Sequence, residues 1–203
     1  PLLHQDSESV IGLIHEAVSL GEEEEVNRNH LGSEESGTEL GNIVAFAHRD
    51  IKPADVMLTK GGLPVLCDLG SCSRAKVKVT SRSQALTLRE SFAEHCTLPY
   101  RAPELLDVQT GSTIDEKVDI WSLGCTLYAL LFNCSPFEYE EMQNGGSMNM
   151  AIGCGTFSFP RGRSDGYSDQ TKELIKWFLT VDPAERPNIE QVLQKALEIQ
   201  REL

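Results

Sequence analysis

The chain is poor in basic and aromatic residues and has no long apolar run. Its 203 residues include only 18 Lys and Arg against 31 Asp and Glu, a formal net charge of −13, and 6% aromatic residues. This balance argues against a general binder of nucleic acids or anionic membranes. Because no apolar run approaches about 18 residues and no leader-like start is visible, we expect neither a transmembrane helix nor a secretory signal. The first residue, Pro1, indicates a fragment or a processed start.

The cysteines lack C-x-x-C spacing, which disfavours zinc and thioredoxin-like sites. Six of them lie at positions 67, 72, 96, 125, 134 and 154. The rest of the composition is ordinary for a globular protein, with 40% hydrophobic and 24% charged residues. We therefore expect reduced, mostly buried thiols in a cytoplasmic protein.

Charge is unevenly distributed along the chain. Residues 1–47 hold ten acids and one base, and no lysine precedes Lys52. Residues 21–41 are acidic and rich in Asn, Gly and Ser, a composition that cannot bury enough apolar surface to offset chain entropy. We predict an acidic, partly disordered N-terminal segment over residues 1–41 and one folded domain over residues 42–203.

Apolar spacing in the second segment predicts a mainly α fold with a small β-hairpin. Two short apolar runs, Val56–Leu58 and Leu63–Leu66, flank the turn residues Gly61 and Gly62, which is a hairpin signal. Residues 120–132 are apolar almost all round, as expected of a helix buried on every side. Further helices are expected over residues 81–95, 168–180 and 188–203, with Ser168 or Asp169 capping the second.

Carboxylates stand at both ends of the predicted hairpin. The run His48-Arg49-Asp50-Ile51-Lys52-Pro53-Ala54-Asp55 precedes it, and Asp68-Leu69-Gly70 follows it. Converging carboxylates suit a hard divalent cation, and a neighbouring lysine suits a phosphate group. These residues alone leave a metal-dependent phosphatase or nuclease open as well as a phosphoryl transferase.

Three later motifs narrow the interpretation. They are Ala102-Pro103-Glu104, then Asp119-Ile120-Trp121-Ser122-Leu123-Gly124, and finally Asp182-Pro183-Ala184-Glu185-Arg186-Pro187. Each is weak alone, but all five motifs in this order form a specific pattern. Residues 45–200 resemble the C-terminal lobe of a eukaryotic protein kinase, whose family fold is α+β. The stretches 96–104 and 118–128 resemble the Numb-associated kinase group, in its myristoylated and palmitoylated serine/threonine kinase branch.

The resemblance assigns three catalytic residues. Asp50 would orient the substrate hydroxyl and accept its proton, and Lys52 would neutralise the transferring phosphoryl group. A lysine at this position is typical of serine/threonine kinases. Thr97 would hydrogen-bond both residues and help to shape the substrate site.

The resemblance also implies ATP and Mg²⁺ as cofactors. Asp55 and Asp68 would be the metal ligands, and Asp68 would hold Mg²⁺ against the nucleotide phosphates. The residues assigned to nucleotide binding are Lys52, Asp55, Met57 and Asp68. A protein substrate is the expected partner, without nucleic acid. Peripheral association with Golgi or endosomal membranes would follow from the family branch only.

A further set of residues receives structural roles by the same resemblance. Glu104 and Arg186 would form a buried ion pair that braces the activation segment. Asp119 would anchor the backbone of the catalytic loop from the central helix. His48 and Arg49 belong to the same loop, and we expect His48 to pack and hydrogen-bond in the core rather than to ligate a metal.

Departures from the family pattern keep two alternatives open. Asp55 stands where the family has Asn, so we expect altered metal affinity and a lower rate. Residues 1–47 contain neither a G-x-G-x-x-G loop nor a lysine, so the N-terminal lobe is expected to be absent. Asn27–Gly41 replaces an expected amphipathic helix, for which Leu2–Leu20 could substitute. The alternatives are an inactive kinase fragment acting as a scaffold or decoy, and a truncated non-functional product.

Overall fold

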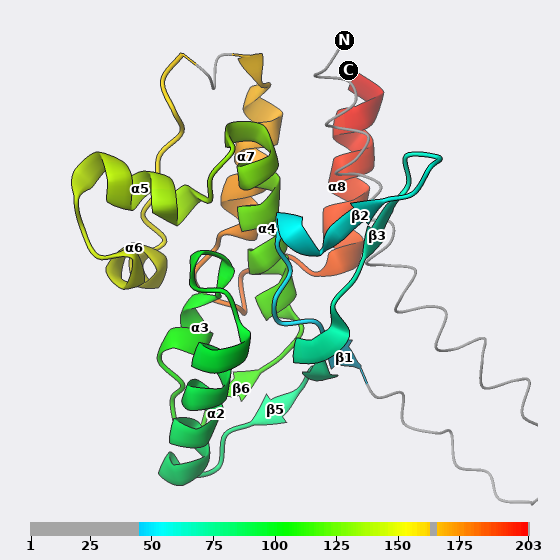
Figure 1. The fold of residues 1–203 in the computed structure, drawn as a ribbon. Coiled ribbons are helices and arrows are strands. Elements are labelled where there is room, and N and C mark those ends of the chain that lie inside the picture. The colour runs from blue at the N-terminus through cyan, green and yellow to red at the C-terminus, as the bar shows by residue number, and fades with distance from the viewer. Residues whose placement is uncertain (1–44, 163–165, 203) are drawn as a thin grey trace, which may run out of the picture.

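A computed structural model describes residues 45–162 and 166–202, and it is mainly helical (Figure 1). The predictions for residues 1–41, including the disorder and the helical periodicity of Leu2–Leu20, lie outside these described residues. The described helices are α2 (Arg82–His95), α3 (Pro103–Leu106), α4 (Lys117–Phe132), α5 (Pro136–Asn144), α6 (Met148–Cys154), α7 (Asp169–Phe178) and α8 (Ile189–Glu202). The mainly α prediction is therefore confirmed.

The described strands form three separate antiparallel pairs. They are β1 (Phe46–Ala47) with β4 (Ser73–Arg74), β2 (Val56–Leu58) with β3 (Pro64–Leu66), and β5 (Val77–Lys78) with β6 (Thr113–Ile114). Short 3₁₀ turns cover Pro53–Asp55, Leu69–Ser71 and Leu98–Tyr100. The first and third strand pairs were not predicted from the sequence.

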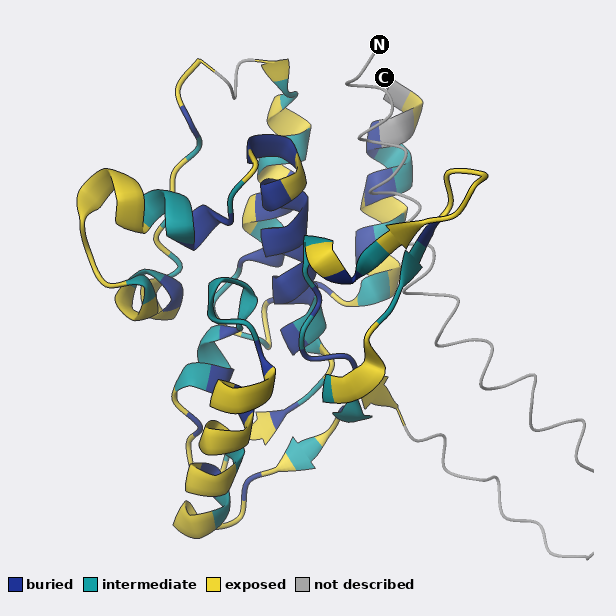
Figure 2. Cartoon of the chain, viewed as in Figure 1, coloured by how far each residue is buried: buried dark blue, intermediate teal, exposed yellow. Residues whose placement is uncertain are grey.

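Helix α4 lies at the centre of the described structure and is buried along almost its whole length (Figure 2). Trp121, Cys125 and Tyr128 are each fully buried, which confirms the prediction made from its all-round apolar composition. Helix α7 packs directly on α4. A Cβ atom added at Gly124 would lie 2.5 Å from the Cβ of Phe178, so the absence of a side chain permits this close approach.

The β2–β3 hairpin carries the predicted turn. Val56 pairs with Leu66 and Leu58 with Pro64, and Gly62 has a φ of 82°, a left-handed conformation that glycine adopts without strain. The hairpin projects from the helical body, and its tip is exposed (Figure 2). Leu58 and Leu63 expose 61% and 68% of their surface.

The predicted helix start at Ser168 is confirmed, because its side chain accepts a hydrogen bond from the Thr171 N–H. Helix α5, which was not predicted, begins with a reciprocal capping box. The Ser135 side chain accepts from the Glu138 N–H, and the Glu138 side chain accepts from the Ser135 N–H. Such a cap satisfies two backbone donors that the helix itself leaves unpaired.

None of the six cysteines, all of which belong to the described residues, forms a disulfide. Only Cys96 and Cys125 are buried, so the prediction of mostly buried thiols is wrong: Cys154 is exposed and the other three are half-buried. Within the part of the chain that the structure describes, no single helix has the length and apolar composition of a membrane span. Helices α4 and α5 meet those criteria only together, as a pair bent by 65°.

Candidate active site

The backbone of the loop before β2 is fixed by a carboxylate from α4. The N–H groups of His48 and Arg49 donate to the two oxygens of Asp119, each at 2.7 Å. Burial raises the pKa of Asp119, and these donors act in the opposite direction. Arg49 has a φ of 68°, which is unusual for a residue with a side chain, and the Asp119 contact stabilises this turn.

The His48 ring joins both ends of the hairpin. Its Nδ1 accepts from the Asp50 N–H at 3.3 Å, which leaves the proton on Nε2 to donate to the carbonyl of Cys67 at 3.1 Å. The His48 carbonyl also accepts from the Ser71 hydroxyl at 2.6 Å. His48 is buried, and its contacts match the expected role of packing and hydrogen bonding.

Arg49 links the same loop to α2. Its guanidinium is buried, donates to the carbonyl of Arg74 at 2.8 Å, and lies 5.1 Å from the ring centre of Phe92. Burial lowers the pKa of Arg49. The contact with Phe92 was not predicted from the sequence, since it joins residues on separate elements whose approach depends on the fold.

The Asp50 carboxylate is held from two sides. Thr97 donates its N–H to Oδ1 at 2.6 Å and its hydroxyl to Oδ2 at 3.1 Å. The Lys52 ammonium pairs with the same Oδ2. Burial lowers the pKa of Lys52, but its hydrogen bonds to Asp50 and Asp55 outweigh burial and raise it. The three residues assigned to catalysis are thus brought together, although 47 residues separate Thr97 from Asp50.

Asp55 and Asp68 are linked through the backbone of the hairpin. The Asp55 carbonyl accepts from the Cys67 N–H at 2.8 Å. Asp68 is the next residue after Cys67, so the backbone of both aspartates lies at the open end of the hairpin. Asp55 is buried, and its Oδ2 lies 2.9 Å from Lys52 Nζ. Asp68 is exposed in a left-handed conformation and accepts from the Gly70 N–H.

The donor set around Asp55 fits Mg²⁺. Among the described residues, the partner of its buried Oδ2 is the Lys52 ammonium alone, and carboxylate oxygens are the ligands that this cation prefers. Among residues 45–162 and 166–202, no three His, Cys, Asp or Glu side chains gather to hold a metal. Mg²⁺ commonly binds one or two carboxylates together with substrate phosphates, so Asp55 and Asp68 would suffice.

Met57, assigned to nucleotide binding, lies on β2 and exposes 61% of its surface. It is one of a set of exposed apolar side chains on or next to the hairpin: Met57, Leu58, Leu63 and Leu69. Of these residues, Leu69 directly follows Asp68 in the chain.

Glu104 and Arg186 form the ion pair that the resemblance predicts. Arg186 is fully buried, and its two terminal nitrogens donate to the two oxygens of Glu104 at 2.8 and 3.0 Å. Arg186 also donates to the carbonyls of Thr180, Lys117 and Val181. This bidentate geometry ties α3 to the loop between α7 and α8.

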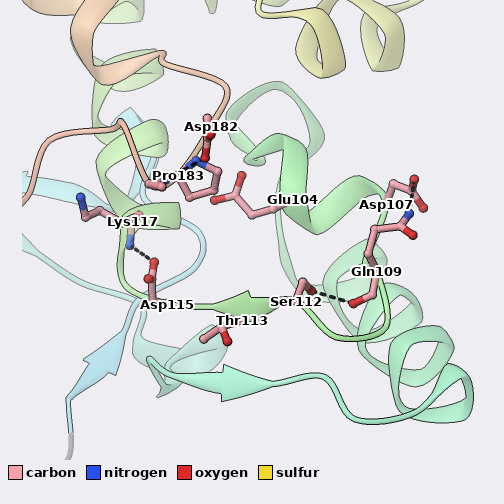
Figure 3. Close-up of a pocket in the computed structure, with 10 residues that line it drawn as sticks. Glu104, Asp107, Gln109, Ser112, Thr113, Asp115, Lys117, Asp182 and Pro183 are labelled. Carbon is pink, nitrogen blue, oxygen red and sulfur yellow. Dashed lines mark hydrogen bonds between the residues drawn. The ribbon is translucent and has the colours of Figure 1, made fainter.

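A groove of about 540 Å³ lies next to this ion pair (Figure 3). Glu104 and Lys117 line it together with the acidic residues Asp107, Asp115 and Asp182. Asp115 accepts from the Lys117 N–H in this view, while the Lys117 ammonium donates to the Arg186 carbonyl. None of the residues assigned to catalysis or to nucleotide binding lines this groove.

Two further polar side chains of α4 contact the main chain near the site, and neither was predicted from the sequence. The Ser122 hydroxyl donates to the Tyr100 carbonyl at 2.8 Å. The Thr126 hydroxyl lies 2.8 Å from the Ser122 carbonyl of its own helix and 3.3 Å from the Ile51 carbonyl. The available signal was their spacing, since two hydroxyls four residues apart in an otherwise apolar helix must share one buried face.

The sequence of this chain is similar to those of known protein kinases. Residues 43–197 match the family described as "Protein kinase domain". The chain is 42% identical over 178 residues to "Serine/threonine-protein kinase ENV7" of Saccharomyces cerevisiae, covering 88% of this chain and 47% of that protein. It is 42% identical over 159 residues to human "Serine/threonine-protein kinase 16", covering 78% of this chain and 51% of that protein. The chain thus spans about half the length of these relatives.

Proposed function

Because the chain belongs to the protein kinase family, we propose that it supplies the catalytic loop for transfer of the ATP γ-phosphoryl group to protein Ser or Thr hydroxyls. The observation that carries this proposal is the position of Asp50. Its carboxylate is fixed by Thr97 and paired with Lys52, which is a catalytic carboxylate beside a phosphate-directed cation.

Each group has a defined task in this reaction. The substrate hydroxyl would hydrogen-bond to Asp50, which orients its oxygen and takes its proton as the new O–P bond forms and the bond from the γ-phosphorus to the leaving ADP breaks. The Lys52 ammonium would compensate the negative charge on the transferring phosphoryl oxygens. Asp55 and Asp68 would hold Mg²⁺, which would supply positive charge against the nucleotide phosphates when bound. Asp119 and His48 keep the loop in place without touching substrate.

We assign the serine/threonine class and, more finely, the Numb-associated group. The support is that the similar yeast and human proteins are named as serine/threonine-protein kinases and that Lys52 lies two residues after Asp50. No lysine precedes Lys52 in this chain, so the lysine that grips the nucleotide in protein kinases would come from residues outside it.

The test uses a fusion protein that supplies the missing part of the nucleotide site. This chain would be fused after the N-terminal half of the similar human kinase, and transfer of labelled phosphate from ATP to Ser/Thr peptides measured. We expect Asp50→Asn to lower the rate by roughly 10²- to 10⁴-fold, as for loss of a general base. Asp169→Asn, at an exposed carboxylate in α7, is the matched control. Equal rates for D50N and the unsubstituted fusion would refute the assignment.

A second candidate function, an inactive scaffold or decoy, is favoured by the exposed apolar hairpin and by the aspartate at position 55. The two proposals differ in their need for nucleotide. Thermal unfolding of the fusion with and without Mg²⁺–ATP separates them, since a ligand at a hundredfold excess over its Kd adds about 2.7 kcal/mol to stability. A transition that ATP leaves unmoved supports the scaffold.

A further inference from the structure

Lys52 is shared between two carboxylates. Its Nζ pairs with Asp50 Oδ2 and lies 2.9 Å from Asp55 Oδ2. The 3₁₀ turn Pro53–Asp55 creates this arrangement, because it folds Asp55 back toward Lys52, with the Asp55 N–H donating to the Lys52 carbonyl at 3.0 Å. An asparagine at position 55 would offer no negative charge to the ammonium, so the pairing depends on the aspartate of this chain.

The two carboxylates differ in the number of groups that contact them. Asp50 is fixed by two hydrogen bonds from Thr97 as well as by Lys52. Asp55 Oδ2 is buried, and its partner among the described residues is the Lys52 ammonium alone. Within residues 45–162 and 166–202, a cation that entered beside Asp55 would therefore compete with one positive group, the Lys52 ammonium.

We propose that Lys52 serves as a built-in counter-cation for Asp55, and that a divalent cation displaces it and releases its ammonium toward the phosphoryl group. The inference rests on the proposed phosphoryl transfer for the use of the released lysine, but not for the displacement itself. Asp55 is in this view a positioning residue: it couples occupation of the metal site to the availability of Lys52.

The physical argument is competition between cations for one oxygen. An ammonium and a divalent cation on the same carboxylate repel each other, and the doubly charged ion interacts more strongly with a carboxylate at the same distance. The Lys52 side chain keeps 20% of its surface exposed on a flexible stem, so it can turn away while the Asp50 contact remains. The exposed Asp68, at the same end of the hairpin, offers the incoming ion a second carboxylate.

The test measures Mn²⁺ binding to the full chain without nucleotide, by the electron paramagnetic resonance signal of free Mn²⁺. Mn²⁺ is the probe because it takes the same oxygen ligands as Mg²⁺. Asp55→Asn should weaken binding by about tenfold or more, since a carboxylate is lost. Lys52→Met should strengthen binding by at least about threefold, since the competitor is lost. Asp169→Asn is the matched control, because it too removes the aspartate of an i,i+3 Lys–Asp pair, at an exposed site.

The opposite signs make the result decisive. A structural role for the Lys52 pairs would make both substitutions weaken Mn²⁺ binding through loss of fold, which far-ultraviolet circular dichroism would register. The proposal is overturned if K52M weakens or leaves Mn²⁺ affinity unchanged, if D55N matches D169N, or if the unsubstituted chain binds no Mn²⁺ above the level of D55N. Because neither nucleotide nor activity enters the assay, failure of the proposed kinase function would leave these affinities unaltered.

Discussion

Replacing Glu104 by glutamine tests how far the fold depends on one buried charge. The Arg186 side chain has no exposed surface, and both its terminal nitrogens donate to Glu104. E104Q preserves the shape of the side chain but removes its charge, so a buried guanidinium loses its counter-ion. Removing one partner of a buried pair typically costs about 3–5 kcal/mol.

The lower end of that range is expected here. Three backbone carbonyls continue to accept from Arg186, and the amide oxygen of the new glutamine can accept one bond. We therefore expect a loss of about 3 kcal/mol, out of the roughly 5–15 kcal/mol by which domains are stable. With a urea slope of about 2 kcal/mol per molar, the unfolding midpoint should fall by about 1.5 M.

The assay is equilibrium urea unfolding followed by tryptophan fluorescence, since Trp121 lies 5.1 Å from the Arg186 guanidinium carbon. Glu173→Gln in α7 is the control, because it breaks an ion pair to Lys176 of similar length, 2.7 Å, between largely exposed side chains. That loss should be at most about 0.5 kcal/mol. If E104Q moved the midpoint no further than E173Q, the argument from burial would be refuted.

Three further predictions concern the site, the core and the thiols. In the two-lobed fusion, Thr97→Ala removes the hydroxyl bond to Asp50 and should lower the catalytic rate by about 10-fold or more. Thr97→Ser keeps that hydroxyl and should retain the rate. Equal rates for the two variants in a steady-state assay would count against this prediction. Gly124→Ala should cost about 1–3 kcal/mol, measured as a lower Tm, because its Cβ would meet α7 at 2.5 Å; an unchanged Tm would contradict the packing. Burial raises the pKa of Cys96 to about 11, so at pH 8 this thiol stays neutral and a thiol reagent should label the exposed Cys154 first, with Cys96 reacting on unfolding; simultaneous labelling in the native state would disprove this.

Elements with a long periodic pattern could be predicted from the sequence. Helix α4 is apolar on every side, and the β2–β3 hairpin has a Gly-Gly turn between apolar runs. The pairs β1–β4 and β5–β6 could not, because a strand of two residues shows no alternation and its partner lies far along the chain. Helix α5 was overlooked although Ser135 and Glu138 carry the spacing of a capping box.

Some contacts of the candidate site could be predicted by resemblance and others could not. The resemblance predicted that Thr97 bonds to Asp50, and the structure shows that contact and adds the atoms that meet. The pairing of Lys52 with Asp55 depends on the tight turn between them, which residue types alone do not specify. The contact of Arg49 with Phe92 likewise depends on how α2 packs, which no local pattern encodes.

Helix α4 contributes both to the core and to the candidate active site, because its apolar residues are buried and its few polar ones hydrogen-bond to neighbouring main chain. Asp119, Ser122 and Thr126 each hold the main chain of a different part of the site. In a genetic screen, substitutions along this one helix should therefore have two kinds of effect, depending on the position. Loss of abundance would map to the apolar positions, whereas well-expressed but inactive protein would map to the three polar ones, within a single stretch of sixteen residues.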